Sequence, residues 1–343
     1  MLLAIATLAP FLHAPQETES KTLTVVTSLP YIADVVRQVG GDDVEAVSLV
    51  PPGVDPHFVE VTPAQIEGLR GADLFLENGM QLEAWAPRVL EASGRADLAQ
   101  GAQAHAFVTT GIVPVEVPTH EELHGGGHVH AAGNPHAWLD PLNLKIVAGN
   151  VADALGRVAP DRRDAFQARR VRFEERIDDA FFGEELRALL GGRTLDRLHR
   201  SGRLIEFLEK REVKGEKLIG MLGGWLGRAR ALPQRKVVSY HRTWSYLERS
   251  LGLEVVATLE EKPGIAPGPA YLEELGAVTR DQGVRLIVAP PYYPTVRIRG
   301  FAERIGGSAV TLPTQPGEAG EAQDVFAMFE QILTALEAAS DGQ

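Results

Sequence analysis

The stretch LTVVTSLPYIADVVRQVGGDDVEAVSLV, residues 23–50, decides the fold class. Its first five residues, Leu23–Thr27, form a short apolar run that is typical of a strand buried on both faces. Residues 30–39 then space their apolar side chains at helical intervals and end at a glycine pair, and residues 44–50 return to a strand pattern. A strand, a helix and a second strand in this order predict a parallel sheet with a right-handed crossover.

The same alternation continues along the chain. In the first half we expect strands at 72–76 and 106–108 and a helix that starts at Thr62-Pro63, where a capping hydroxyl precedes a proline. Asp140-Pro141 is a second start of this kind, for a helix that reaches about residue 158. The second half repeats the pattern, with strands and helices expected in turn at residues 236–240, 243 onward, 254–258, 269–282, 285–289, 295–306, 308–312 and 322–338.

Two such series predict an α/β protein with two parallel-sheet lobes that face each other across a cleft. A highly charged helix that begins at Pro160-Asp161 is long enough to join the lobes as a rigid connector. We therefore expect a signal-like segment at 1–20, an N-terminal α/β lobe at 21–140, linking helices at 141–182, a basic helical insertion at 183–236 and a C-terminal α/β lobe at 237–340.

Composition excludes several classes of protein. The chain has 343 residues, 44% of them hydrophobic, which is enough for two domains with their own cores. Its formal net charge of −12 argues against a nucleic-acid-binding protein, which is normally basic. Cysteine is absent, so disulfides, thiolate metal sites and lipid attachment at a cysteine are all excluded for this sequence.

The first residues are typical of an exported protein. Met1–Ala14 is an apolar run followed by polar residues, and it is shorter than the roughly 20 residues that a membrane span needs. It is similar to the hydrophobic region of a secretory signal, although no Lys or Arg precedes it and Pro10 interrupts it. We expect export.

Residues 183–236 interrupt the alternation of strands and helices. They contain 13 Lys or Arg against 7 Asp or Glu, a local net charge of +6, so the other residues together carry −18. The pattern predicts two or three short helices with glycine-rich breaks. This insertion is either a solvated helical addition or a docking surface for a partner or an anionic membrane.

Five of the ten histidines fall between residues 120 and 136. Four of them surround a run of three glycines without an apolar period, which predicts a flexible loop rather than a helix or strand. Neutral imidazole is a common metal ligand, so we expect this loop to capture metal ions weakly. Its histidines are His120, His124, His128 and His130.

Three further histidines occupy positions where the fold places ligands. His57 lies beyond the second strand, His136 precedes the expected helix start at Asp140, and His241 directly follows the strand KVVSY. Open parallel sheets bind ligands outside the carboxyl ends of their strands. Three histidines spread over two lobes, with a histidine-rich loop beside one of them, predict a metal site.

Five segments of the chain carry a resemblance to a known family. They read VVTSLPYIADVVRQVGG, LVPPGVDPHFVEVTPAQIEGLRGADLFLENG, NPHAWLDPLN, VVSYHRTWSYLERSLGLEVV and APGPAYLEEL. The chain resembles the zinc/manganese solute-binding proteins of bacterial ABC transporters, apart from the signal-like segment and the insertion. The resemblance implies two α/β lobes joined by a long rigid helix, with one metal ion in the cleft between them, and delivery of that ion to a permease in the inner membrane.

The resemblance also implies the ligands. It assigns His57 and His136 of the first lobe and His241 of the second, where manganese members have a carboxylate in place of His241. Imidazoles suit Zn²⁺ and carboxylates favour Mn²⁺, so Zn²⁺ is the expected ion. Many members have an Asp after the last strand, and some zinc members have a Glu before the first histidine, but this chain has LPTQPGE and Pro56 there. The fourth ligand is left open between water, Glu318, Glu260 and a histidine of the loop.

These expectations together describe a periplasmic, monomeric, high-affinity zinc receptor without enzymatic activity. Three histidines and a water also form catalytic zinc sites, but the sequence lacks HExxH, GxxxxGK[ST] and GxSxG, and LGGWLG at 222–227 lacks the strand and lysine of a phosphate loop. A manganese receptor, a metal-dependent adhesin and an iron-chelate receptor remain as alternatives. The last would use aromatic and Arg residues of the cleft, such as Tyr292, Tyr293 and Arg297.

Overall fold

The computed structural model describes residues 21–124, 129–262, 264–318 and 323–341. The signal-like segment at 1–20 lies outside the described residues. Within the described part of the chain, no helix is both long enough and apolar enough to cross a membrane.

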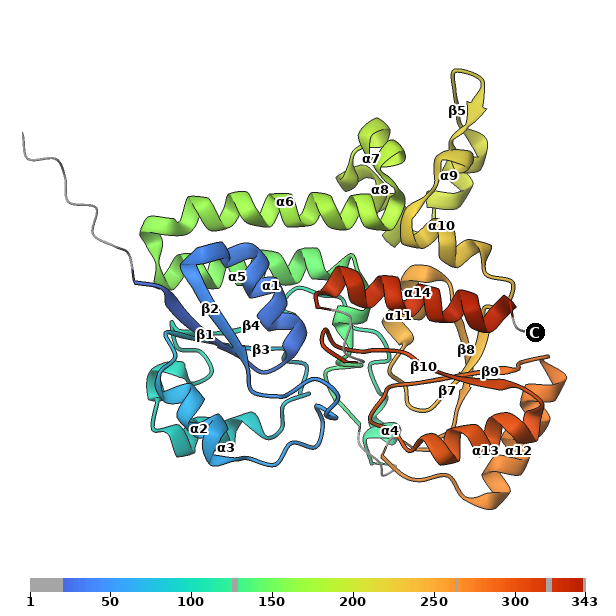
Figure 1. Ribbon diagram of the computed structural model, residues 1–343, viewed down its shortest axis with the longest axis horizontal. Helices are drawn as coiled ribbons and strands as arrows, with labels where there is room; N and C mark the ends of the chain where they lie inside the picture. The colour runs from blue at the N-terminus through green and yellow to red at the C-terminus, as the bar shows by residue number, and fades with distance from the viewer. Residues whose placement is uncertain (1–20, 125–128, 263, 319–322, 342–343) are drawn as a thin grey trace, which may run out of the picture.

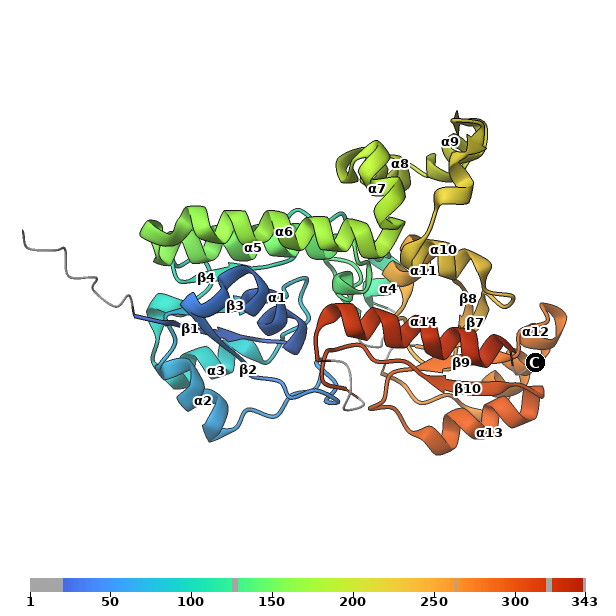
Figure 2. The same ribbon diagram turned by 45° about the horizontal axis from the view of Figure 1, so that its top comes forward.

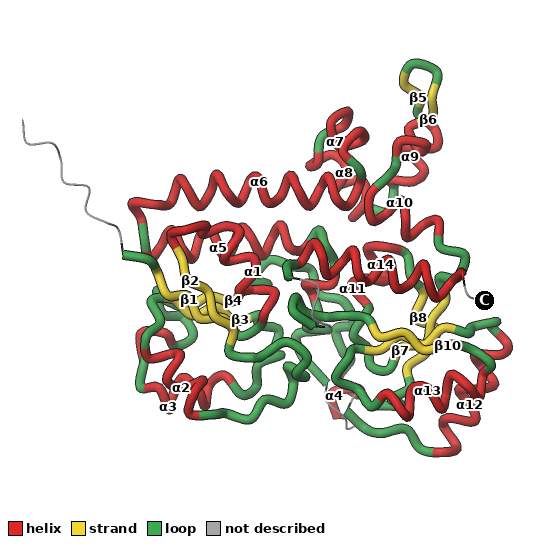
Figure 3. Tube along the Cα trace, in the orientation of Figure 1, coloured by secondary structure: helices red, strands yellow, loops and turns green. Residues whose placement is uncertain are grey.

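Two four-stranded parallel sheets form the framework, one in each half of the chain (Figures 1 and 3). The first has the order β2-β1-β3-β4, and the second, read from its other edge, has the order β8-β7-β9-β10. The strands are β1 (Leu23–Thr27), β2 (Val44–Ser48), β3 (Leu74–Glu77), β4 (His105–Phe107), β7 (Lys236–Ser239), β8 (Glu254–Thr258), β9 (Leu286–Ala289) and β10 (Ser308–Thr311). The two lobes therefore repeat one strand order, which confirms the predicted α/β fold.

The central strands are buried because helices cover both faces of each sheet. Val25 in β1 pairs with Ala46 on one side and Leu74 on the other, and its side chain is fully buried. The helices of the first lobe are α1 (Pro30–Gly40), α2 (Pro63–Arg70), α3 (Ala86–Ser93) and α5 (Asn143–Val158), and those of the second are α11 (Ser245–Leu251), α12 (Pro269–Asp281) and α13 (Thr295–Ile305). The predicted start at Thr62 is a complete capping box with Gln65.

Two long helices link the lobes, one running along the first lobe and one along the second, and each reaches the neighbouring lobe (Figures 1 and 2). Helix α6 (Arg163–Phe182) follows a 3₁₀ turn at Pro160–Arg162, packs along α5 and ends beside α10 (Gly224–Ala231). Helix α14 (Val325–Asp341) packs against α1 of the first lobe and β10 of the second. The carboxylate of Asp34 in α1 accepts a hydrogen bond from Val325 N at 2.9 Å and so caps α14.

The basic insertion is more elaborate than the sequence pattern predicts. It contains α7 (Glu184–Leu190), α8 (Gly192–Arg200), α9 (Leu204–Lys210), the hairpin β5 (Glu212–Val213) and β6 (Glu216–Lys217), and α10. These are four helices rather than two or three. Helices α7 and α8 pack against α6, whereas α9 and the hairpin project away from the two lobes (Figure 3). The hairpin was missed because its turn uses Lys214 at φ 53° before Gly215, and lysine rarely adopts that conformation.

Two local predictions are wrong. Residues 120–124 form a short helix, α4 (His120–His124), because Thr119 and Glu122 form a reciprocal capping box that the histidines obscured in the sequence. Helix α5 begins at Asn143 rather than at Pro141. The Asp140 carboxylate accepts from Leu142 N at 3.0 Å, as an N-cap side chain does. Two tighter turns, from Asn143 N to Asp140 O and from Leu144 N to Pro141 O, then precede the regular turns of α5.

Candidate metal centre

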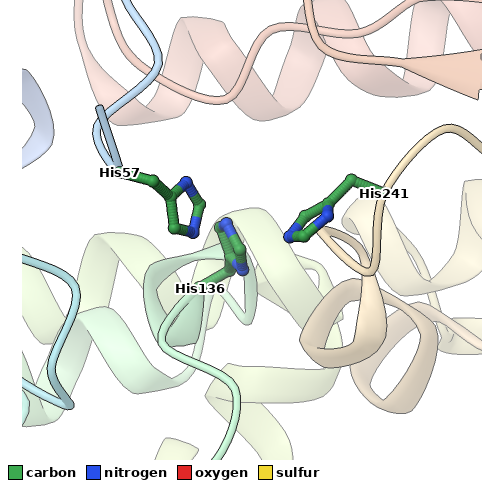
Figure 4. Close-up of side chains that lie close together, drawn as sticks. All are labelled: His57, His136 and His241. Carbon is green, nitrogen blue, oxygen red and sulfur yellow. The ribbon is translucent and has the colours of Figure 1, made fainter. Parts of the chain in front are cut away.

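The three cleft histidines meet at one point between the lobes, and their rings point toward one another (Figure 4). His57 lies in the loop after β2, His136 lies just before the 3₁₀ turn η3 (Ala137–Leu139), and His241 lies just after β7. The ring centroids are 5.1 to 5.7 Å apart, and one nitrogen of each ring lies within 4.8 Å of the others. Nitrogens bound to one zinc ion lie at most about 4.2 Å apart, so small side-chain shifts would close the set around it.

The first two histidines are held by the same local device. In Asp55-Pro56-His57, Asp55 Oδ1 accepts from His57 N at 3.0 Å and lies 2.7 Å from its Nδ1. In Asn134-Pro135-His136, Asn134 Oδ1 accepts from His136 N at 3.0 Å and lies 2.9 Å from its Nδ1. A short Asx side chain folds back onto the residue two positions later, and each ring is thereby oriented by its own loop.

The third histidine, His241, is held by Glu260 from the loop that follows β8. His241 Nδ1 lies 2.8 Å from Glu260 Oε2, and both side chains are buried. Glu260 N donates to Tyr240 O at 3.0 Å, which continues the pairing of β7 and β8 past their ends. The parallel register therefore places the Glu260 carboxylate beside the His241 ring.

Each ring thus presents Nδ1 to an oxygen acceptor, so Nε2 is the nitrogen that would bind a metal ion, the arrangement usual for histidines that bind metals. The Nε2 atom of His136 is buried and has no hydrogen-bond partner among the described residues, which is costly for a polar atom unless a ligand binds it. Burial lowers the pKa of His136 well below its ordinary value, and the neighbouring His57 and His241 lower it further. His136 is therefore neutral near pH 7, as a metal ligand must be.

Asn134 joins the two halves of the site. Its Nδ2 donates to Arg242 O at 2.7 Å, next to His241 in the chain, and to Glu116 Oε2 at 2.7 Å. Its Oδ1 holds the ring of His136. One buried amide therefore fixes a histidine of the first lobe relative to the backbone of the second.

The two glutamates considered as fourth ligands are engaged elsewhere. Glu260 holds the His241 ring and also accepts from Gly264 N at 3.0 Å. Glu318 accepts from the backbone amides of Gly53, Thr314 and Gln315, so it ties the loop before His57 to the loop after β10. Burial raises the pKa of Glu318 in spite of these hydrogen bonds.

The loop histidines are divided between the site and the surface. His130 lies beside the site, with its ring centroid 5.4 Å from that of His57 and its Nδ1 3.2 Å from Gln81 O. His120 is exposed at the start of α4. His128 and the side chain of His124 lie outside the described residues.

A cavity of about 640 Å³ opens beside His136 and His241. Among the described residues that line it, the carboxylates outnumber the cations, with Glu116, Glu121, Glu122 and Glu261 against Arg242 and Lys262. The aromatic trio suggested for a chelate is not part of this lining. Instead, Tyr293 stacks on Tyr240 at 4.2 Å, and Arg297 donates to the Tyr240 hydroxyl at 3.2 Å.

The family described as zinc-uptake complex component A, periplasmic, matches residues 25–185 and 220–339. The chain belongs to this family. The match omits residues 186–219, which carry most of α7, all of α8 and α9, and the hairpin.

Relatives within and around this ZnuA family are named for different metals. The chain is 32% identical over 173 residues to the iron-binding protein YfeA of Yersinia pestis. The matched residues are 50% of this chain and 51% of that protein. It is 23% identical over 311 residues to the high-affinity zinc uptake system protein ZnuA of Bacillus subtilis, 90% of this chain and 83% of that one. A crystal structure of ZnuA superimposes with a TM-score of 0.68 at 21% identity, covering 93% of this chain and all of that one, and so shares the fold.

Proposed function

We propose that this ZnuA-family protein is a periplasmic receptor that captures Zn²⁺ with His57, His136 and His241 and delivers it to an ABC permease in the inner membrane. The observation that carries the proposal is the convergence of three buried imidazoles, each with Nδ1 directed to an oxygen acceptor and one ring nitrogen within 4.8 Å of a nitrogen of the other two. Borderline nitrogen ligands suit Zn²⁺ better than Mn²⁺, which prefers oxygen ligands. The ion is cargo here, so the site binds and releases it without catalysis.

The cavity favours a free metal ion over an anionic metal chelate. Its described lining has an excess of carboxylates, which attracts cations and repels the carboxylate or phenolate groups of a chelator. The fourth ligand is water or His130, because His130 lies beside His57 while Glu260 and Glu318 are held by other groups.

A competition titration tests the choice of metal. Protein stripped by a chelator is titrated with Zn²⁺ and Mn²⁺ against a chromophoric chelator. We expect one tight equivalent of Zn²⁺ that excess Mn²⁺ does not displace. A preference for Mn²⁺ contradicts the proposal, and so does the absence of any tight equivalent.

A second comparison separates the cleft site from the histidine-rich loop. We expect His241→Ala to abolish the tight equivalent, because it removes one of the three imidazoles. It also leaves the buried Glu260 carboxylate without the His241 ring beside it. Deletion of residues 120–130 removes His130 and the weak capture sites but leaves the three-histidine set, so its effect on affinity is smaller. Equal losses from the two changes contradict this division of roles.

A further inference from the structure

Helix α8 belongs to the insertion that the family match omits, yet it is closely packed into the family fold. A Cβ atom at Gly192 would lie 1.8 Å from Asp178 Oδ2 of α6, so only glycine allows the helix to approach so closely. Lys145 of α5 donates from Nζ to Asp178 of α6 at 2.7 Å and to Asp196 of α8 at 3.4 Å. Helix α8 is therefore fixed to both α5 and α6.

The far end of α8 reaches the second lobe. The ring of His199 lies against Phe181, with centroids 5.1 Å apart, and is hydrogen-bonded to the backbone of Ser250 in α11. Helix α11 follows His241 by a few residues and packs on η3, which follows His136. Helix α8 thus lies behind the point where the two lobes present their histidines.

One hydrogen-bond chain runs from α8 to the backbone next to His136. Arg200 Nη1 donates to Asn143 Oδ1 at 3.1 Å, and Asn143 Nδ2 donates to Ala137 O at 2.9 Å. Asn143 is fully buried, and Ala137 directly follows His136. Arg200 therefore fixes the amide orientation of Asn143, and Asn143 in turn fixes the first peptide of η3.

We propose that Arg200 is a positioning residue for the metal site, through which the inserted helix α8 holds His136 in its ligand geometry. The inference rests on the proposed function, because it takes His136 as a ligand of the captured ion. Under this proposal the inserted helix α8 contributes to the affinity of the site for zinc. A positive charge near the site repels a cation, so loss of the charge alone would strengthen zinc binding, whereas loss of positioning weakens it.

The test compares Arg200→Ala with Arg203→Ala. Arg203 is an exposed arginine of the same insertion whose guanidinium bonds only to Ser201 among the described contacts, so the control removes the same charge without touching the chain of hydrogen bonds. We expect Arg200→Ala to weaken zinc binding by about threefold to tenfold, less than the loss typical of groups bonded directly to a ligand. Arg200→Lys keeps one donor and should recover part of the affinity.

Hydrogen exchange of the zinc-free protein gives a readout that does not depend on metal binding. The amides of Leu139 and Asp140 bond to the carbonyls of His136 and Ala137 at 3.2 and 3.3 Å, and they should exchange faster in Arg200→Ala than in Arg203→Ala. Faster exchange confined to η3, together with weaker zinc binding, supports the proposal. Unchanged exchange and affinity in Arg200→Ala, with a tight site in the unsubstituted protein, overturns it and leaves the zinc receptor intact. Absence of the tight site in the unsubstituted protein overturns both.

Discussion

Asn134 is the single residue on which the geometry of the site depends most. It orients the His136 ring through Oδ1 and binds Arg242 O, beside His241, through Nδ2. This one amide therefore contacts both lobes directly beside the histidines. Its loss would free the His136 ring and loosen the spacing between His136 and His241.

We therefore expect Asn134→Ala to weaken zinc binding by about 10- to 100-fold, the range found when a partner of a metal-binding histidine is removed. Asn150→Ala is the matched control, because Asn150 also donates to two backbone carbonyls, those of Val108 and Thr110, but lies away from the histidines. Chelator competition on both variants measures the difference. Similar affinities in the two variants would contradict a role for Asn134 in the site.

The sequence contains more of the site than the pattern of histidines alone indicates. Asp55-Pro56-His57 and Asn134-Pro135-His136 are two copies of one tripeptide pattern, and the pattern encodes the hydrogen bonds that the structure shows. Glu260, the partner of His241, is not marked by any short sequence pattern of this kind. Glu260 reaches the ring only because β7 and β8 are parallel neighbours, and a contact of that kind depends on the tertiary fold.

Helix α8 carries one partly buried imidazole, His199, whose ring packs on Phe181. Burial lowers the pKa of His199 to about 4, against its ordinary value near 6.5. As the pH falls below 6.5 the unfolded chain binds this proton first, because the folded protein resists it until about pH 4. The contribution of His199 to stability is therefore complete above pH 6.5 and is lost between pH 6.5 and 4.

We expect zinc-free protein with His199→Gln to lose less stability than the unsubstituted protein between pH 7 and pH 4, by up to about 3 kcal/mol. Urea unfolding across this range measures the difference, and excess chelator keeps the cleft histidines free of metal. Parallel stability profiles would show that the ring accepts its proton without cost and that α8 is loosely packed.

Most strands and helices of the two lobes were predicted from periodicity to within two residues, although the last helix, expected at 322–338, lies at 325–341. The insertion was predicted less well. Strands such as Leu23–Thr27 are continuous apolar runs between turn signals, and a short apolar run identifies a buried strand by itself. Helix α4 and the β5-β6 hairpin depend on single capping and turn residues, Thr119 and Lys214, inside polar sequence. Polar segments carry little periodic signal, so their structure follows from local hydrogen bonds instead.

On the scale of the whole molecule, two lobes with one strand order place ligands at the carboxyl ends of their strands. His57 and His136 come from the first lobe and His241 from the second, so an ion held by all three, as we propose, would bond to both lobes. The lobes are held in contact around that point by the long helices α6 and α14. The Glu318 carboxylate also joins them, because it accepts from Gly53 N of the first lobe and Thr314 N of the second. Release of an ion held in this way would separate His241 from His57 and His136.

The most direct test of this arrangement is zinc X-ray absorption on the protein loaded with one equivalent of Zn²⁺. The account predicts a four-coordinate shell of nitrogen and oxygen at about 2.0–2.1 Å, with the scattering of at least three imidazoles. His241→Ala should remove one imidazole from that shell. A six-coordinate shell dominated by oxygen, or a shell with fewer than three imidazoles in the unsubstituted protein, would contradict the claim that His57, His136 and His241 bind the ion together.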